Sequence, residues 1–329
     1  TLEDDVLYLA KLAHQKTGSK KLCLAGGVAL NCIINKKLIE SDLFDDIFIQ
    51  PAASDEGIAL GCALFGYYSN GGSASYHMSH AYLGLRNKPE SLSKVINKWK
   101  LDASKSSSQE IAHLLADGKI IGRVAGRSEY GPRALGNRSI LADPRRPDMK
   151  NRLNTEIKRR ESFRPFAPSC LEDKIPNYFQ SPAKSPFMVV AGTISKNSRN
   201  KVPSITHADD SCRIQTVNRE QNLDYYELIE AFGDLTGCPV LTNTSFNDCD
   251  EPMVETYDDA VNCFLKTGLD ALCCDGFLIK RNENTPTLTS KQNTENTIVR
   301  VNNEYQNLID RFCDVSIFVN LANKLNKNE

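Results

Sequence analysis

Arginines between residues 127 and 164 have the type and spacing that suit chemistry on phosphorylated molecules. They stand in the runs GRSEYGPRALGNRSILADPRRPD and IKRRESFRPFAPS, which are interrupted by glycine and proline. Because these residues form tight turns rather than continuous helices, they hold guanidinium groups at fixed angles. A guanidinium group can grip a phosphate or a carboxylate through two hydrogen bonds. The predicted catalytic arginines are Arg127, Arg133, Arg138, Arg160 and Arg164.

A structural role is the simpler interpretation for any one of these arginines. Acidic residues such as Glu129, Asp143 and Glu161 stand nearby in the sequence and could pair with them. For the group, a pocket for a small polyanionic ligand explains the pattern better, because arginines on a solvated helix normally alternate with acidic residues at helical spacing. The two interpretations differ in geometry, since only the second requires the side chains to converge.

Composition limits the classes of function. The chain has 329 residues, of which 40% are hydrophobic and 25% are charged, which predicts a soluble protein of about two domains. A net charge of -1 argues against nucleic acid as a partner, because such binding needs a large basic excess. The sequence has no signal peptide and no apolar run that could span a membrane, so we expect a cytoplasmic protein whose 11 scattered cysteines are free thiols.

Two strand–turn–helix units are predicted near the N-terminus. A short apolar strand at 22–25 leads to a glycine pair and a helix. A strand at 46–50 leads to the turn ASDEG, in which Ser54 or Asp55 is expected to cap the next helix. A helix N-terminus at a strand end favours anions or polar sugar edges, although a lone glycine pair serves plain turn geometry equally well.

The longer C-terminal region alternates between strand and helix patterns, which predicts an α/β fold. Strands are expected at 119–125, 187–191, within 238–247 and at 271–280, and helices after residue 107 and at 149–156, 225–232 and 258–265. Ligands gather at strand ends in such sheets, and the first of these strands ends at Gly126-Arg127. The segment SNGGSAS marks a domain boundary, which gives domains at 1–76 and 77–283, with a linker and C-terminal helix at 284–329.

The run GRSEYGPRALGNRSILADPR, followed by NRLNTEIKRRESFRPFAPS, resembles the carbamoyltransferases of the NodU/CmcH type. The likeness extends over nearly the whole chain up to about Lys280. It implies an α/β fold with a partial actin-like (ASKHA, TsaD-like) second lobe followed by a YrdC-like α/β domain. It also implies that an N-terminal half of the same protein is missing, so we expect the chain to be a fragment or a processed piece.

The resemblance assigns roles in the N-terminal lobe. LAGGVALN is similar to the nucleotide-binding turn of that lobe, which implies nucleotide contacts from Gly26, Gly27 and Asn31. The aspartate of the matching DEG turn binds a divalent metal in the family, which implies that Asp55 is a ligand of Fe(II) or Mg(II). The family's HxxxH ligands have no counterpart here. His77 and His80 are spaced HxxH in a linker, and we do not expect them to bind the metal.

Two further segments resemble the family's ligand pocket. THADDSCRIQ is similar to the THxDGxxRxQ stretch that lines the carbamoyl-phosphate and nucleotide pocket, which implies a catalytic His207 and a binding Arg213, although Asp210 stands where the family has glycine. The SxN element in NTSFN resembles an ATP-contacting one. The nucleotide-binding residues implied there are Asn243, Ser245 and Asn247. A histidine near an aspartate and a polar turn are also common structural features.

The resemblance implies an ATP-dependent O-carbamoyltransferase. Carbamoyl phosphate and ATP would form carbamoyl-adenylate in the YrdC-like domain, and the carbamoyl group would pass to a hydroxyl of a small acceptor, such as a sugar or secondary metabolite. Such a site crowds negative charge that arginines neutralise. Two alternatives stay open: a protein of the tRNA threonylcarbamoylation type, against which the net charge argues, and a truncated nucleotide-binding module without full activity.

Overall fold

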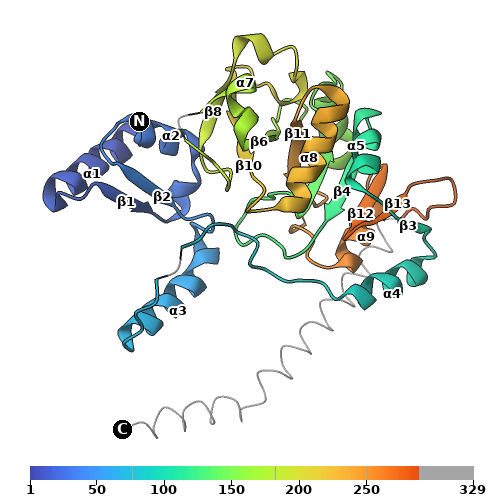
Figure 1. Cartoon of the computed structure of the whole chain (residues 1–329), viewed down its shortest axis with the longest axis horizontal. Coiled ribbons are helices and arrows are strands. Elements are labelled where there is room, and N and C mark those ends of the chain that lie inside the picture. The colour runs from blue at the N-terminus through green and yellow to red at the C-terminus, as the bar shows by residue number, and fades with distance from the viewer. Residues whose placement is uncertain (76, 182, 250, 289–329) are drawn as a thin grey trace, which may run out of the picture. The chain divides into compact units, whose positions relative to one another are not determined.

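A computed structural model describes residues 1–75, 77–181, 183–249 and 251–288 (Figure 1). Residues 1–285 form one compact unit. The domain boundary expected after residue 76 stays a prediction, and the linker and helix expected at 284–329 lie almost entirely outside the described residues. Within those residues, no helix is long and apolar enough to cross a membrane.

Residues 1–70 contain a two-stranded parallel sheet in which β1 (Lys21–Leu24) pairs with β2 (Asp46–Ile49). Each strand leads through a short 3-10 turn to a helix, as the sequence predicts. These helices and turns are α1 (Leu2–Thr17), η1 (Gly27–Leu30), α2 (Cys32–Glu40), η2 (Asp55–Gly57) and α3 (Ile58–Ser69). Asn31 caps α2, because its side-chain oxygen accepts two N–H groups of the first turn. The cap expected from Ser54 or Asp55 is wrong, because no side-chain cap bond forms at the start of η2 or α3.

An eight-stranded mixed sheet, in the order β10-β6-β11-β5-β4-β12-β13-β3, forms the centre of the remaining part. Its strands are β3 (Ala103–Lys105), β4 (Ile121–Val124), β5 (Arg138–Ala142), β6 (Ala167–Leu171), β10 (Gln215–Val217), β11 (Val240–Ser245), β12 (Ala271–Cys274) and β13 (Phe277–Lys280). A smaller antiparallel sheet consists of β7 (Phe179–Gln180), β8 (Ala191–Ile194) and β9 (Ser211–Arg213). The predicted α/β class is confirmed.

Helices α5 and α8 lie side by side and cover one face of the large sheet (Figure 1). Their apolar side chains, among them Leu115 and Phe232, form one buried cluster with Ile121, Leu141 and Leu241 of the sheet. Burial of this size is the main stabilising contribution to such a layer. The helices of this part are α4 (Pro89–Trp99), α5 (Ser108–Ala116), α6 (Met149–Arg152), α7 (Ile175–Tyr178), α8 (Leu223–Thr236) and α9 (Tyr257–Lys266), with short turns η3 (Leu153–Ile157), η4 (Glu172–Lys174), η5 (Lys196–Ser198) and η6 (Pro203–Ile205).

Two predicted strands differ from the structure. The single strand expected at 271–280 is a hairpin of β12 and β13, joined by Asp275 and Gly276 with φ angles of 43° and 81°. A two-residue hairpin turn needs such positive φ angles, and Asp-Gly is a favoured pair for it. The strand expected at 187–191 is mostly a buried loop, in which Met188 has a φ of 54° and interrupts the extended backbone.

Candidate functional site

A cavity of about 320 Å³, which we call the arginine pocket, brings together arginines from three separate segments. It is lined by Pro132, Arg133, Ala134, Arg160, Arg164, Pro165, Phe166, Ala167, Met188, Arg213, Asn243, Thr244 and Ser245. Arg133 lies on the loop between β4 and β5, Arg160 and Arg164 precede β6, and Arg213 ends β9. The last residues of β11 supply the neutral polar groups of the lining.

Three of these arginines make no ion pair within the described part of the chain. The Nε atoms of Arg133 and Arg213 are buried without a hydrogen-bond partner. Burial lowers the pKa of Arg133. Burial is also the main cause that lowers the pKa of Arg213 to about 10, and repulsion from the charge of Arg133 adds to it. Arg160 donates from Nε to Asn154 Oδ1 over 2.8 Å, and burial also lowers its pKa. An anionic ligand would offset this concentration of positive charge.

Arg164 differs from the other three because its Nε lies 2.9 Å from a carboxylate oxygen of Glu161. Both side chains of this pair are about half exposed, so the pair is weak and can open toward a ligand. Arg164 therefore lines the pocket while keeping the acidic partner that the structural interpretation foresaw.

Arg127 and Arg138 do not join the arginine pocket, so the convergence expected for all five arginines is wrong for these two. Arg138 is fully buried on β5, and its five N–H groups donate to backbone carbonyls, including those of Ala125 and Gly126. Arg127 is exposed and donates to the carbonyl of Leu83. Both residues are structural, but they hold backbone carbonyls and not the carboxylates that the structural interpretation expected.

A smaller cavity of about 160 Å³ adjoins the arginine pocket and shares Arg213 and Phe166 with it. His207 lines this cavity, and its Nδ1 lies 3.2 Å from the hydroxyl of Ser211. Burial lowers the pKa of His207, so the imidazole is neutral near neutral pH. Cys32, at the first turn of α2, lines the same cavity and brings the N-terminal part of the chain to the site.

The N-terminal residues predicted to bind nucleotide line neither cavity. Asn31 uses its side-chain oxygen to cap α2, and the N–H of Gly26 donates to the carbonyl of Ala53. A Cβ atom on Gly27 would lie 3.6 Å from the Ser54 hydroxyl, which is ordinary contact. Of this segment, Cys32 and Ile33, which follow Asn31 directly, line the smaller cavity.

Lys158 belongs to the site but was not singled out from the sequence. Its ammonium group donates to the carbonyl and side-chain oxygens of both Ser245 and Asn247. Burial lowers the pKa of Lys158 to about 8. The lysine therefore anchors the SxN turn at the edge of the arginine pocket. The sequence feature that could have identified Lys158 is its position in the basic run IKRRESFR, beside the predicted arginines.

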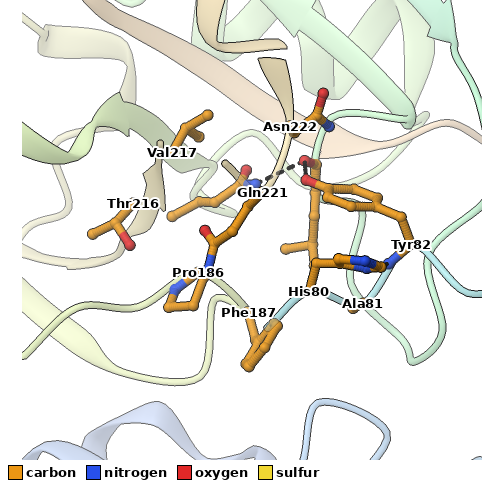
Figure 2. A pocket seen from close by; sticks show the side chains of 11 residues that line it. His80, Ala81, Tyr82, Pro186, Phe187, Thr216, Val217, Gln221 and Asn222 are labelled. Atoms are coloured by element: carbon orange, nitrogen blue, oxygen red, sulfur yellow. Dashed lines mark hydrogen bonds between the residues drawn. The ribbon is translucent and has the colours of Figure 1, made fainter. Parts of the chain in front are cut away.

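The described residues do not themselves provide a metal site. Among them, no group of three histidine, cysteine, aspartate or glutamate side chains is close enough to hold a metal ion. Asp55 lies in η2 without such neighbours. His80 packs its ring on Tyr82 with 5.8 Å between ring centroids, beside a cavity of only about 10 Å³ (Figure 2). Its Nδ1 accepts the N–H of Tyr82, so the imidazole is used in holding this loop.

Comparison with known families finds two matches that together cover most of the described chain. The family described as "Carbamoyltransferase C-terminus" matches residues 112–281, and the one described as "Carbamoyltransferase N-terminus" matches residues 1–64.

Curated proteins of similar sequence are about twice as long as the matched region. Nodulation protein NolO of Bradyrhizobium diazoefficiens is 44% identical over 85% of this chain and 53% of its own length. Nodulation protein NolNO of Sinorhizobium fredii is 43% identical over 87% of this chain and 43% of its own length. The chain thus spans about half the length of these relatives. Among solved structures, full-length HypF in its phosphate- and nucleotide-bound form aligns at a TM-score of 0.35 and 14% identity over 57% of this chain and 23% of HypF, too weakly to support an argument.

Proposed function

The chain belongs to the carbamoyltransferase family, and from this premise we propose that its arginine pocket binds ATP and carbamoyl phosphate and forms carbamoyl-adenylate. One observation carries the proposal: Arg133, Arg160 and Arg213 line one cavity and make no ion pair within the described residues. Guanidinium groups that are buried and left without carboxylates suit a ligand with several phosphate charges. The α/β sheet places the cavity beside the end of β11, where ligands commonly bind in such folds.

The proposed reaction has three bond exchanges. Water cleaves carbamoyl phosphate into carbamate and inorganic phosphate. A carbamate oxygen then attacks the α-phosphorus of ATP, and pyrophosphate leaves with the electron pair of the broken P–O bond. Finally, an acceptor hydroxyl oxygen attacks the carbamoyl carbon, its proton passes to a base, and AMP leaves. Adenylation matters because carbamate itself is a poor electrophile, whereas AMP is a good leaving group.

The residues of the pocket have separate tasks in this scheme. Arg133 and Arg213 hold the phosphate oxygens on which charge is concentrated during attack at the α-phosphorus, and Arg160 adds a third positive charge. His207 is neutral and lines the adjoining cavity, so it is placed to accept a proton from the water that cleaves carbamoyl phosphate. Lys158 keeps the SxN turn in place below the nucleotide.

The transfer step needs parts that the described residues do not supply. We propose that the acceptor, a small molecule with a hydroxyl group, binds with the help of an N-terminal half like that of the longer relatives. Asp55 would contribute one ligand to a divalent metal, Fe(II) or Mg(II), and the remaining ligands would have to come from that N-terminal half, because the described residues supply no others beside Asp55. The expected cytoplasmic location belongs to the same proposal.

The substitution Arg133→Ala tests the adenylation step. It should abolish pyrophosphate release from ATP that depends on carbamoyl phosphate, because the phosphates lose a buried cation. The melting temperature without ligand should not fall, since Arg133 makes no ion pair with the rest of the described chain. Arg127→Ala is the matched control, because Arg127 lies outside the pocket, and it should keep the activity.

Three results would change the interpretation. A large fall in the melting temperature of the ligand-free Arg133→Ala protein would show a structural role for this arginine. ATP binding by the wild-type chain without pyrophosphate release would favour the truncated nucleotide-binding module over an enzyme. Binding of tRNA at physiological salt would favour the tRNA threonylcarbamoylation type, although a net charge of -1 does not suit that partner.

A further inference from the structure

The loop of residues 131–137 carries Arg133 into the arginine pocket. Buried polar side chains form hydrogen bonds with the backbone of this loop. We propose that Glu129 is a positioning residue, which fixes Arg133 for phosphate binding by holding the backbone of residues 135–138. The proposal deepens the proposed function and rests on it for its effect on catalysis, while the hold on the loop can be measured separately.

Glu129 makes an unusual set of hydrogen bonds for a single carboxylate oxygen. Its side chain is buried, with 7% of the residue exposed. The Oε1 atom accepts the N–H groups of Leu135, Asn137 and Arg138 over 2.7, 2.8 and 3.3 Å. Burying a carboxylate costs free energy unless hydrogen bonds compensate it, and these three N–H groups offset only part of that cost. Burial still raises the pKa of Glu129, and its Oε2 is buried without a hydrogen-bond partner among the described residues. The three hydrogen bonds that Oε1 accepts therefore all come from the backbone of residues 135–138.

The carbonyl groups of the same loop are held by other buried side chains. The donors are Asn243 Nδ2 to Ala134 (3.2 Å), Tyr82 Oη and Gln215 Nε2 to Leu135 (2.9 and 2.7 Å), and Arg123 Nη1 to Gly136 (2.6 Å). In Figure 2, a dashed line marks the hydrogen bond that the hydroxyl of Tyr82 donates to the carbonyl of Leu135. These bonds connect the loop to β4, β10 and β11, so the sheet fixes its position.

External support is needed because the loop cannot hold its own shape. Gly131 and Gly136 have φ angles of 123° and 114°, which other residues rarely adopt. Glycine leaves the unfolded chain more freedom than any other residue, so such a loop is costly to order. The close fit allows no drift, since a Cβ atom on Gly136 would lie 2.4 Å from the ring of Tyr225. A cation used in catalysis must be held within fractions of an ångström by its surroundings.

The test uses the 329-residue chain with Glu129→Gln and Glu129→Ala, and with Glu255→Gln as matched control. Glu255 also accepts from a backbone N–H and a hydroxyl, those of Leu85 and Ser128, but not from the N–H groups of the Arg133 loop. Amide hydrogen exchange at residues 135, 137 and 138 reports the hold on the loop. Pyrophosphate release at varied ATP concentration reports its consequence for binding.

Glu129→Ala should speed exchange at the three amides at least about tenfold, with a smaller effect for Glu129→Gln, which keeps one acceptor oxygen. The KM for ATP should rise at least about fivefold and kcat should fall as well, because a loosened Arg133 weakens both the binding of the phosphates and the stabilisation of the charge that builds up during attack. Simple loss of folded protein would lower kcat and leave KM unchanged. Glu255→Gln should shift neither quantity.

The proposal is overturned if exchange and KM stay at wild-type values in both Glu129 variants, or if Glu255→Gln raises KM equally. If the wild-type chain releases no pyrophosphate, the proposed function fails, but the exchange data still decide whether Glu129 holds the loop. If Glu129→Ala does not fold, Tyr82→Phe removes a single hydroxyl that donates to the carbonyl of Leu135 in this loop, and it should raise exchange and KM in the same direction. An unchanged KM and unchanged exchange in Tyr82→Phe would then count against the proposal.

Discussion

Replacing Arg213 by methionine should make the ligand-free protein more stable while it removes affinity for ATP. Burial and the nearby charge of Arg133 lower the pKa of Arg213 from 12.5 to about 10. At about 1.4 kcal/mol per pH unit, this difference corresponds to a cost on the order of 3 kcal/mol for keeping the group charged in the folded state. Methionine keeps a long unbranched side chain in the same space.

The sign of the effect follows from the direction of the pKa change. The folded-state pKa lies below the unfolded-state value, so the cost is fully present below about pH 10 and declines only as the pH rises from there toward 12.5. Near neutral pH the whole cost applies. Because the protein and solvent relax around the charge of Arg213, we expect a measured gain of about 1–3 kcal/mol in the free energy of unfolding.

Urea unfolding of the wild type and Arg213→Met near neutral pH, with and without ATP, measures both effects. Arg138→Met is the contrasting variant, because the fully buried Arg138 donates to backbone carbonyls and its loss takes away the donor of those of Ala125 and Gly126. It should lose at least about 2–3 kcal/mol. Saturating ATP, at about a hundred times its Kd, should stabilise the wild type by about 2.7 kcal/mol and Arg213→Met much less.

A lower free energy of unfolding for ligand-free Arg213→Met, as expected for Arg138→Met, would contradict the prediction. In that case the guanidinium group of Arg213 contributes to folding, and the pocket holds no excess of charge for a ligand to offset. Equal stabilisation of wild type and Arg213→Met by ATP would refute the other half of the prediction, because the nucleotide would then bind elsewhere.

Raising the pH through about 8 should weaken ATP binding, because Lys158, whose pKa burial lowers to about 8, loses the proton that it donates to Ser245 and Asn247. Calorimetric titrations with ATP on both sides of that pH measure this, and Lys158→Met should bind ATP weakly at every pH. If the affinity of the wild type for ATP did not change over this pH range, Lys158 would not be the group that controls binding. Asp55→Ala, in a chain joined to an N-terminal half, should keep pyrophosphate release and lose carbamoyl transfer to the acceptor. Loss of pyrophosphate release in that variant would argue against two separate sites.

Local patterns sufficed for those parts of the fold in which the chain sets its own geometry. The helix at α8 and the buried strand at β4 were predictable from apolar spacing. The hairpin of β12 and β13 was not predicted, although Asp275-Gly276 carries a hairpin signal, because the apolar residues on both sides suggested one continuous strand. The loop around Met188 was missed for a different reason: an apolar run looks the same whether it is buried in a sheet or in a loop.

The site shows where sequence reasoning stops. Arg133 and Arg138 are five positions apart in one motif and have opposite roles, because β5 begins at Arg138 and is paired on both sides by β4 and β11. Pairing with distant strands buried Arg138 inside the sheet, and no local pattern states that pairing. Arg213 comes to the pocket on β9, and only the family resemblance had connected it with the motif.

Asn243 shows how the neutral and charged residues of the pocket differ. It was predicted to contact the nucleotide, and it lines the pocket, but its Nδ2 donates to Ala134, Ser169 and Gln215 of the protein. Its Oδ1 is buried without a partner. The amide nitrogen of Asn243 thus holds the loops, whereas the Nε of Arg133 is buried without a hydrogen-bond partner among the described residues. A ligand that binds beside Arg133 would therefore meet a charge that is already partly desolvated, which strengthens its attraction for phosphate.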